Sequence, residues 1–164
     1  MVILVYKFMY PNSSEGLNKE TEDSIYFFTV PFEPLNNWSS HKVNIWGIDF
    51  PTSEHAFQWK KFSEIEPDIA NKILLAGSPY AVFKISKANK SKQPKDWAEI
   101  KITIMEEILR AKCKQHEDVQ DALKMAGGRK IIENSPVDIF WGIGPNKDGK
   151  NMLGNIWMKI RDNL

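Results

Sequence analysis

The sequence predicts an α+β fold, namely a single helix-rich domain with a small, mostly antiparallel sheet. Runs of β-branched and aromatic residues occur mainly before residue 51 and in two short segments near the end. Six later stretches carry apolar residues at helical spacing, and several of them begin at a proline or a small polar cap. The 164 residues fit one domain, and no repeat or linker divides them.

The strand-like segments are short and are separated by turn-forming residues. The segment 43–50 alternates apolar and polar residues around Gly47, which predicts a bent strand or a short hairpin. The polar segment 11–23 is expected to be a loop, so that 1–23 form an N-terminal extension and 24–164 the domain proper. The expected strands comprise residues 1–10, 24–30 and 43–50, while 130–133 and 138–143 are expected as two short strands or extended segments.

The helical segments are marked by their first and last residues. Pro51 precedes a small polar cap, Gly77 is a helix stop, and Gly127 and Gly128 form another. The helix beginning at Pro94 is expected to be the longest, with an apolar stripe that continues to Ala111. The expected helices begin at Thr52 or Ser53, Pro67, Ser78, Pro94, Asp118 and Met152.

Composition excludes several classes of function. The net charge of +1, from 22 basic and 21 acidic residues, lacks the basic excess that nucleic-acid backbones attract. The one cysteine, Cys113, excludes an internal disulfide or a cysteine-based zinc site, and the three histidines have no ligand spacing. The apolar N-terminal run is too short for a membrane helix and lacks a signal peptide's basic start. We expect a cytoplasmic protein with no membrane association, no metal and no cofactor.

The stretch Pro51–Glu64, PTSEHAFQWKKFSE, mixes polar and apolar residues instead of separating them onto opposite faces. At about 100° per residue, Gln58 lies about 40° and Lys61 about 20° from Glu54, so these three share one face. Lys60 lies on a different face. A lysine partly buried near carboxylate and amide groups can act as a nucleophile, because burial disfavours its charged form, although an adjacent acid favours it.

The same residues also have a purely structural explanation. Glu54 lies in the first helical turn, where the helix dipole favours an acid whatever its function. Glu54 and Lys61 could both be solvated, and His55 could be a hydrogen-bonded core histidine. Periodicity alone favours this explanation over a catalytic face.

A second dense region is Glu133–Gly144, ENSPVDIFWGIG. Trp141 offers a stacking surface and Gly142 permits close backbone approach to a ligand, although a buried strand with a glycine turn explains both equally well. Asn151, at the start of the last helix, is either a cap or marks a helix N-terminus that could hold phosphate. Gly154, inside that helix, indicates close packing or the approach of a ligand.

Five stretches carry a resemblance to a known family. They are PTSEHAFQWKKF, SPYAVFK, DWAEIKITIM, GGRKIIENSPVDIFWGIG and KNMLGNIWMKIR. In the same order they resemble the NADAR domain, the YbiA-like family of N-glycosidases, and the resemblance covers 24–164. The segment PLNNW at Pro34–Trp38 is similar to the family's LSNF-type segment. WK before the lysine and MAGG in place of an ATG-like run depart from the family's pattern, and neither removes an expected catalytic group.

The resemblance implies cleavage of an N-glycosidic bond at the anomeric carbon of a ribose. In one branch of the family a lysine of the EHxFQxxKF segment is implicated as a covalent nucleophile through a Schiff base, and the matching position is Lys61. The expected catalytic residues are Lys61, Glu54 and Asp138. The expected substrate-binding residues, among which the three tryptophans are candidate platforms for the base, are Asn37, Trp38, His55, Gln58, Trp97, Glu133, Trp141, Gly142 and Asn151.

Three functions follow from these expectations. The first is hydrolysis of a ribosylamino-pyrimidine phosphate of the riboflavin-intermediate type, which the near-neutral charge favours mildly. The second is removal of ADP-ribose from guanine bases of nucleic acid. The third is a non-catalytic module that binds ADP-ribose or a nucleotide sugar and would not need Lys61 or Glu54. The expected partner is therefore a small ribosyl or ADP-ribosyl substrate, or ADP-ribosylated nucleic acid, and the sequence predicts no oligomeric state.

Overall fold

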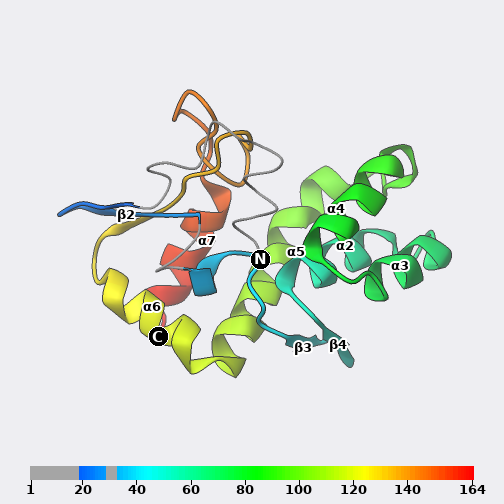
Figure 1. The fold of residues 1–164 in the computed structure, drawn as a ribbon, viewed down its shortest axis with the longest axis horizontal. Helices are drawn as coiled ribbons and strands as arrows, with labels where there is room; N and C mark the ends of the chain where they lie inside the picture. The colour runs from blue at the N-terminus through cyan, green and yellow to red at the C-terminus, as the bar shows by residue number, and fades with distance from the viewer. Residues whose placement is uncertain (1–18, 29–32) are drawn as a thin grey trace. The chain divides into compact units, whose positions relative to one another are not determined.

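The computed structural model describes residues 19–28 and 33–164, which form two compact units (Figure 1). The terminal unit combines the described part of Met1–Ser39 with His116–Leu164, and the inserted unit is Ser40–Gln115. The inserted unit therefore interrupts the terminal unit in sequence. The strand expected at 1–10 lies outside the described residues.

A three-stranded sheet forms the centre of the terminal unit. Its strands, in the order β1-β2-β5, are β1 (Lys19–Glu20), β2 (Ser24–Phe27) and β5 (Lys130–Glu133). β2 pairs antiparallel with β1 and parallel with β5. The strands expected at 24–30 and 130–133 are confirmed within the described residues, where β2 ends at Phe27. Ile25, Phe27 and Ile131 are fully buried and anchor the sheet in the core.

The helices of the terminal unit are α6 (Glu117–Ala126) and α7 (Met152–Arg161), with the 3-10 turn η1 at Glu33–Leu35. α7 lies against β5, and Gly154 makes this possible because a Cβ there would meet the Ile131 carbonyl oxygen at 2.1 Å. Close packing is therefore the reason for this glycine. The Trp157 indole, fully buried on α7, donates to the Leu35 carbonyl at 2.8 Å and ties η1 to the helix.

Residues 138–143, expected as a short strand or an extended segment, form a series of bends and no strand. Their carbonyl groups accept hydrogen bonds from the chain that follows: Met152 N–H donates to Phe140 at 3.1 Å and Leu153 N–H to Trp141 at 3.0 Å. These donors are the first amides of α7, which need partners outside the helix. The segment therefore caps α7 and, among the residues that the structure describes, pairs with no strand.

The inserted unit begins with a hairpin, which confirms the second alternative expected for 43–50. Its strands are β3 (Val43–Ile45) and β4 (Ile48–Phe50), joined by Trp46 and Gly47. Both turn residues have positive φ, 53° and 74°. Two-residue hairpin turns favour this conformation because its twist matches that of the strands. The Trp46 ring, held in that turn, stacks on Trp59 at a centroid distance of 6.2 Å.

Four helices complete the inserted unit. They are α2 (Ser53–Phe62), α3 (Pro67–Leu74), α4 (Pro79–Ala88) and α5 (Trp97–Gln115), with a 3-10 turn at Lys90–Lys92. Thr52 and Ser78 cap α2 and α4 by accepting the amides of His55 and Ala81. The expected helices are confirmed, although α5 starts three residues after Pro94.

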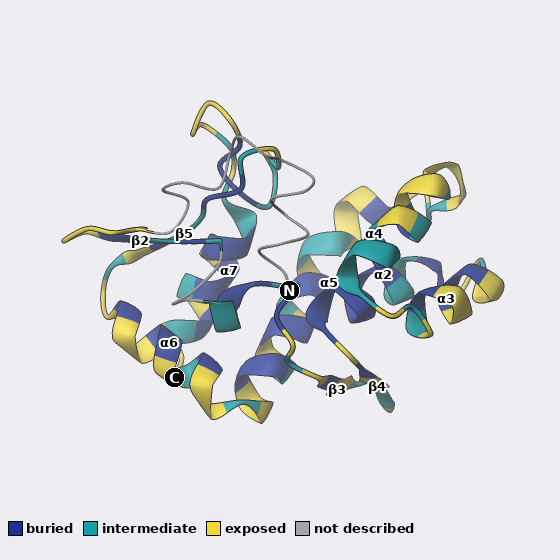
Figure 2. Cartoon of the chain, in the orientation of Figure 1, coloured by how far each residue is buried: buried dark blue, intermediate teal, exposed yellow. Residues whose placement is uncertain are grey.

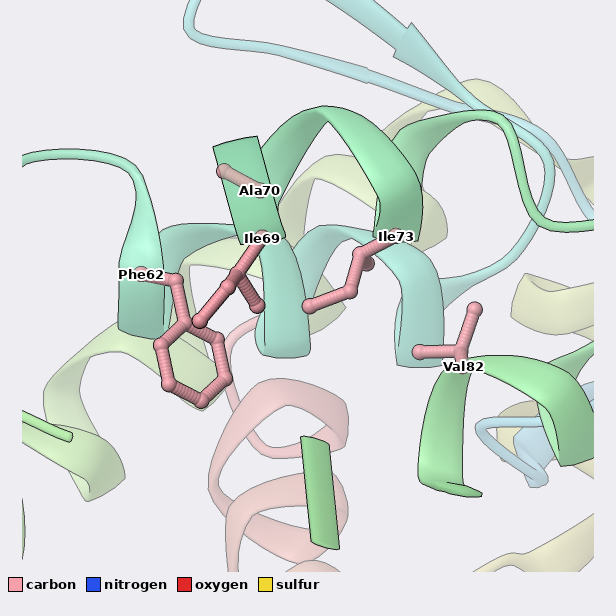
Figure 3. Close-up of a cluster of buried hydrophobic side chains, with 5 residues drawn as sticks. All are labelled: Phe62, Ile69, Ala70, Ile73 and Val82. Carbon is pink, nitrogen blue, oxygen red and sulfur yellow. The ribbon is translucent and has the colours of Figure 1, made fainter. Parts of the chain in front are cut away.

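An apolar cluster fixes α2, α3 and α4 against one another (Figure 3). Burying each of its larger side chains contributes about 1.5–3 kcal/mol relative to exposure. The buried faces of α2 and α5 are visible as dark segments in Figure 2. The cluster therefore determines where α4 places its polar residues relative to α2. Its members are Phe62, Ile69, Ala70, Ile73 and Val82, with Trp59, Ala76 and Ile85 partly buried beside them.

Two findings concern the described residues as a set. No helix within 19–28 and 33–164 is long and apolar enough to cross a membrane. Over the same ranges, no group of three or more His, Cys, Asp or Glu side chains is placed to hold a metal ion. Cys113 lies buried in α5.

Candidate active site

The buried face of α2 carries polar side chains. Glu54 and Gln58 are 7% and 8% exposed. Glutamate is almost never so buried without a partner, and here the Gln58 Nε2 amide donates to the Glu54 Oε1 carboxylate oxygen at 2.9 Å. The two residues are one helical turn apart, as the 100° spacing predicts. The expected polar face therefore points into the inserted unit.

A serine of α4 extends this pair to Lys61. The Ser86 hydroxyl donates to Gln58 Oε1 at 2.6 Å and lies 3.1 Å from Lys61 Nζ, which donates to it. Lys61, Ser86, Gln58 and Glu54 thus form one continuous hydrogen-bonded chain. The orientation of the Gln58 amide is assigned from this network, since only its nitrogen can donate to the carboxylate.

The Lys61 amine lies between this polar chain and aromatic rings. Its nitrogen is 5.3 Å from the centre of the Trp97 ring and 5.8 Å from that of Phe62, and Trp97 packs on Phe57 at 5.1 Å. Trp97 is itself 5% exposed, so it forms an apolar wall for the amine.

Burial lowers the pKa of Lys61 to about 8. The Glu54 carboxylate opposes the shift by favouring the charged amine, while the nearby positive charges of Lys101 and Lys90 reinforce it. At neutral pH about one-tenth of the amine is then uncharged, far more than for an ordinary lysine. An uncharged lysine amine of this kind can act as a nucleophile near neutral pH.

Lys60, the neighbouring lysine, lies in different surroundings. Its amine pairs with Glu64 at 2.6 Å and lies 5.6 Å from the centre of the Trp46 ring. Helical phasing separated the two lysines correctly, because only Lys61 reaches the buried polar chain.

His55 has a structural role in α2. Its Nε2 lies 3.0 Å from the Ala76 carbonyl oxygen, which can only accept, so Nε2 carries the proton. Nδ1 then accepts from the Thr52 hydroxyl at 2.8 Å. Burial lowers the pKa of His55 and keeps this neutral form. His55 is 1% exposed with both ring nitrogens bonded, which corresponds to the core-histidine alternative and leaves no ring nitrogen for a substrate.

The other expected residues belong to the terminal unit, and most of them lie in or beside the loop between β5 and α7. Asp138 Oδ1 accepts the amides of Phe140 and Trp141, both at 2.8 Å. A Cβ at Gly142 would lie 2.7 Å from the Ser135 Cβ, so this glycine allows packing within the loop. The Trp141 ring is half-buried and packs edge-on against Phe140 at 5.0 Å.

Asn151 is not a side-chain cap, contrary to the simplest expectation. Its amide oxygen accepts from Glu133 N–H at 2.8 Å, and its amide nitrogen donates to the Ile131 carbonyl at 2.9 Å. The expected phosphate site at the start of α7 is also contradicted, because the amides of Met152 and Leu153 are already bonded to loop carbonyls.

The segment around Asn37 and Trp38 forms a turn after η1. The Trp38 amide donates to Asn36 Oδ1 at 2.7 Å, and the Asn36 amide group donates to the Phe28 carbonyl at 2.6 Å. Asn37 and Trp38 are half-buried. The Asn36 side chain thus holds the backbone of this turn at Trp38 and at Phe28.

Sequence reasoning missed Ser86. A weak signal was present, since Ser86 lies four residues after Val82, a member of the apolar cluster, and so continues a buried face with a polar residue. Its partners are 25 and 28 residues away in sequence, and helical periodicity carries no information about such pairings.

Comparisons with known proteins agree in placing the chain. A family model described as the NADAR domain matches residues 21–164. The N-glycosidase Npun_R5314 of Nostoc punctiforme is 33% identical over 144 residues, which cover 86% of this chain and 92% of that protein. N-glycosidase YbiA of Escherichia coli K12 is 28% identical over 146 residues, covering 89% and 90%.

A longer relative and a solved structure add to this. The riboflavin biosynthesis protein VVA0006 of Vibrio vulnificus is 32% identical over 146 residues, which are 87% of this chain and 39% of that protein. The NMR structure of E. coli YbiA matches with a TM-score of 0.79 at 26% identity, over 91% of this chain and 89% of that one. The helix-rich α+β fold with small sheets is thus the fold of YbiA.

Proposed function

The chain belongs to the NADAR family, and from this premise we propose that it is an N-glycosidase, a hydrolase that cleaves the bond between a ribose C1 carbon and a nitrogen base. The observation that supports this most directly is the Lys61 amine, half-buried, with its pKa lowered to about 8, and joined to Glu54 through Ser86 and Gln58. N-glycosidase is also the printed name of the relatives from Nostoc and E. coli.

The reaction we propose is covalent. The Lys61 lone pair attacks C1, the C1–O bond of the ring breaks with its electron pair going to the ring oxygen, a proton passes from Nζ to that oxygen, and the C1–N bond to the base breaks. The base leaves with the bonding electron pair and takes up a proton, while C1 and Nζ form an iminium ion. Water then adds to C1 and the C1–Nζ bond breaks, which returns the amine and releases the sugar. Each proton transfer needs a positioned acid or base.

Glu54 is the residue we assign to these proton transfers, because its carboxylate is buried in the same unit and belongs to the same hydrogen-bonded chain as Lys61. Asp138, in the terminal unit, stays a prediction of the family resemblance; within its own loop its Oδ1 accepts two amides.

The proposed substrate is a ribosylamino-pyrimidine phosphate. Two relatives support this choice by name, the riboflavin biosynthesis proteins VVA0006 of Vibrio vulnificus and PYRR of Zea mays. The balanced charge of the chain also favours a small substrate over nucleic acid.

The test is a pair of assays on one set of variants. Release of ribose phosphate from the pyrimidine intermediate is measured beside release of ADP-ribose from modified guanine in DNA and RNA. We expect turnover of the pyrimidine substrate by the wild type and a loss of at least 1,000-fold in Lys61→Met, an amount typical of removing a nucleophile. Lys60→Met is the matched control and should retain activity.

Borohydride reduction during turnover tests the covalent step. An iminium ion on Lys61 would be reduced to a stable sugar adduct, located by peptide mass spectrometry. Full activity in Lys61→Met with no adduct would overturn the covalent route. ADP-ribose release alone would replace the substrate, and binding without any turnover would indicate a non-catalytic module.

A further inference from the structure

The Ser86 hydroxyl occupies the middle of the chain that joins Lys61 to Glu54. Ser86 is 5% exposed and lies in the last turns of α4, a helix that contributes no other member of this chain. Serine hydroxyls inside helices often bond to the carbonyl one turn earlier. Here the hydroxyl bonds to two side chains of α2 instead.

The hydrogen-bond directions follow from counting protons. A serine hydroxyl has one proton, and at 2.6 Å it is donated to Gln58 Oε1. Toward Lys61, at 3.1 Å, the hydroxyl oxygen can therefore only accept. Because Gln58 Nε2 donates onward to Glu54, each of the three hydrogen bonds between Lys61 and Glu54 is donated in the direction of the carboxylate.

This direction matters for an uncharged amine. When Lys61 is neutral, one of its N–H bonds points at Ser86, and the lone pair must point elsewhere. A hydroxyl that donated to the amine would instead occupy the lone pair and block its attack. The Gln58–Glu54 pair prevents that arrangement as long as Glu54 is ionised, since an ionised carboxylate only accepts.

We propose that Ser86 is a positioning residue that holds the Lys61 amine by one N–H bond and keeps its lone pair available for attack on C1. The inference rests on the proposed role of Lys61 as the nucleophile. It assigns to α4 a part in the reaction, in which the Ser86 hydroxyl acts through its hydrogen bonds to Lys61 and Gln58. Because Ser86 is held by Gln58, the ionised Glu54 carboxylate determines the direction of its hydroxyl.

The first test measures Lys61 chemistry without substrate. Glycolaldehyde with cyanoborohydride alkylates uncharged amines, and mass spectrometry of the Lys61 peptide between pH 6 and 10 gives the midpoint of its labelling. The charged groups near this amine are Glu54, Lys101 and Lys90, all retained in the variant. Loss of the accepting hydroxyl in Ser86→Ala should move the midpoint down by about half a pH unit, because that hydrogen bond favours the charged amine.

The second test follows the sugar adduct trapped by borohydride at saturating substrate and at a pH above the midpoint. We expect the trapping rate of Ser86→Ala to fall at least tenfold with little change in KM, although more of its amine is uncharged. Ser86→Thr keeps the hydroxyl and should recover to within about threefold of wild type. Ser63→Ala is the matched control. It removes a hydroxyl that donates to the Lys60 carbonyl at 3.3 Å and has no part in the hydrogen bonds that join Lys61 to Glu54.

These outcomes separate the inference from the proposed function. If Ser86→Ala matches wild type in both labelling midpoint and trapping rate, the positioning role is wrong, even with Lys61 trapped in both proteins. If wild type forms no adduct on Lys61, the covalent function is wrong, and the role of Ser86 in it falls with it. An unchanged thermal unfolding midpoint of Ser86→Ala excludes misfolding as the cause of a lower rate.

Discussion

A single lysine on α2 combines the properties that a nucleophile needs. Lys61 reaches a buried polar chain, whereas Lys60 pairs with Glu64 on the exposed side of the helix. The difference depends only on the 100° that separates adjacent residues on a helix. At the scale of residues, Lys61 therefore differs from Lys60 in being withdrawn from water beside buried polar groups.

The activity should depend on pH through the Lys61 amine. In the proposed reaction the uncharged amine attacks, so the rate should rise about tenfold per pH unit below pH 8 and level off above it. In Lys101→Met a neighbouring positive charge is removed, which raises the pKa of Lys61 and should move the profile to higher pH. Initial rates between pH 5.5 and 10 measure both effects. An identical profile for this variant would contradict the electrostatic account.

Stability should improve when Lys61 is removed. Its pKa is about 8 in the folded protein and near 10.5 when unfolded, so the unfolded chain holds the proton more tightly. The cost of burial is fully present below pH 8 and disappears as pH rises through 10.5, because stability rises with pH wherever the unfolded state binds more protons.

The gain can be estimated from that shift. The full shift corresponds to about 3 kcal/mol, which the partial exposure of Lys61 and its lost bond to Ser86 reduce to about 1 kcal/mol. In urea titrations at pH 7, the free energy of unfolding of Lys61→Met should therefore be about 1 kcal/mol higher than that of wild type. This difference should shrink towards pH 10. Lys60→Met, which loses a surface ion pair, is the control, and a Lys61→Met variant less stable than wild type at pH 7 would contradict the estimate.

At the scale of elements, Gly154 allows helix α7 to lie close to strand β5. Gly154 on α7 leaves room for the Ile131 carbonyl oxygen of β5, which a Cβ would meet at 2.1 Å. Gly154→Ala should therefore lower the free energy of unfolding by about 1–3 kcal/mol, although alanine favours helices. Chemical denaturation measures the loss.

Gly77→Ala is the matched control, since a Cβ at Gly77 meets nothing within 4 Å. It should change stability by less than about 0.5 kcal/mol. Equal effects of the two substitutions would show that backbone freedom, and not the approach of α7 to β5, decides the outcome.

Elements with local signals were predictable from the sequence, and those held by distant partners were not. Thr52 is a cap because its hydroxyl bonds an amide three residues on, and both residues are visible in the sequence. The segment at Asp138 was misjudged because its apolar residues are typical of a strand, while its carbonyls bond amides of 150–153. The hydrogen bonds of Ser86 to α2 were likewise not predictable from the sequence. Ser86 lies on α4, which α3 separates from α2 in sequence, so these bonds depend on how the helices pack.

At the scale of the whole molecule, the balance of charge bears on the substrate. With 22 basic and 21 acidic residues, the chain should not bind unmodified nucleic acid at physiological salt. Fluorescence anisotropy with labelled DNA and RNA duplexes at 150 mM salt should show no binding at micromolar protein. Binding that weakens steeply with added salt would contradict this and would favour ADP-ribosylated nucleic acid as the substrate.

Asn151 has a consequence for solubility. Within the described sheet β5 is an edge strand, and this one side chain bonds two of its backbone groups, Ile131 C=O and Glu133 N–H. The Asn151 side-chain amide thus makes the two hydrogen bonds that a peptide group of a neighbouring strand would make. These two groups are then not available to pair with a strand of another molecule. Asn151→Ala should reopen that edge, and light scattering near the unfolding temperature should detect faster aggregation than in wild type.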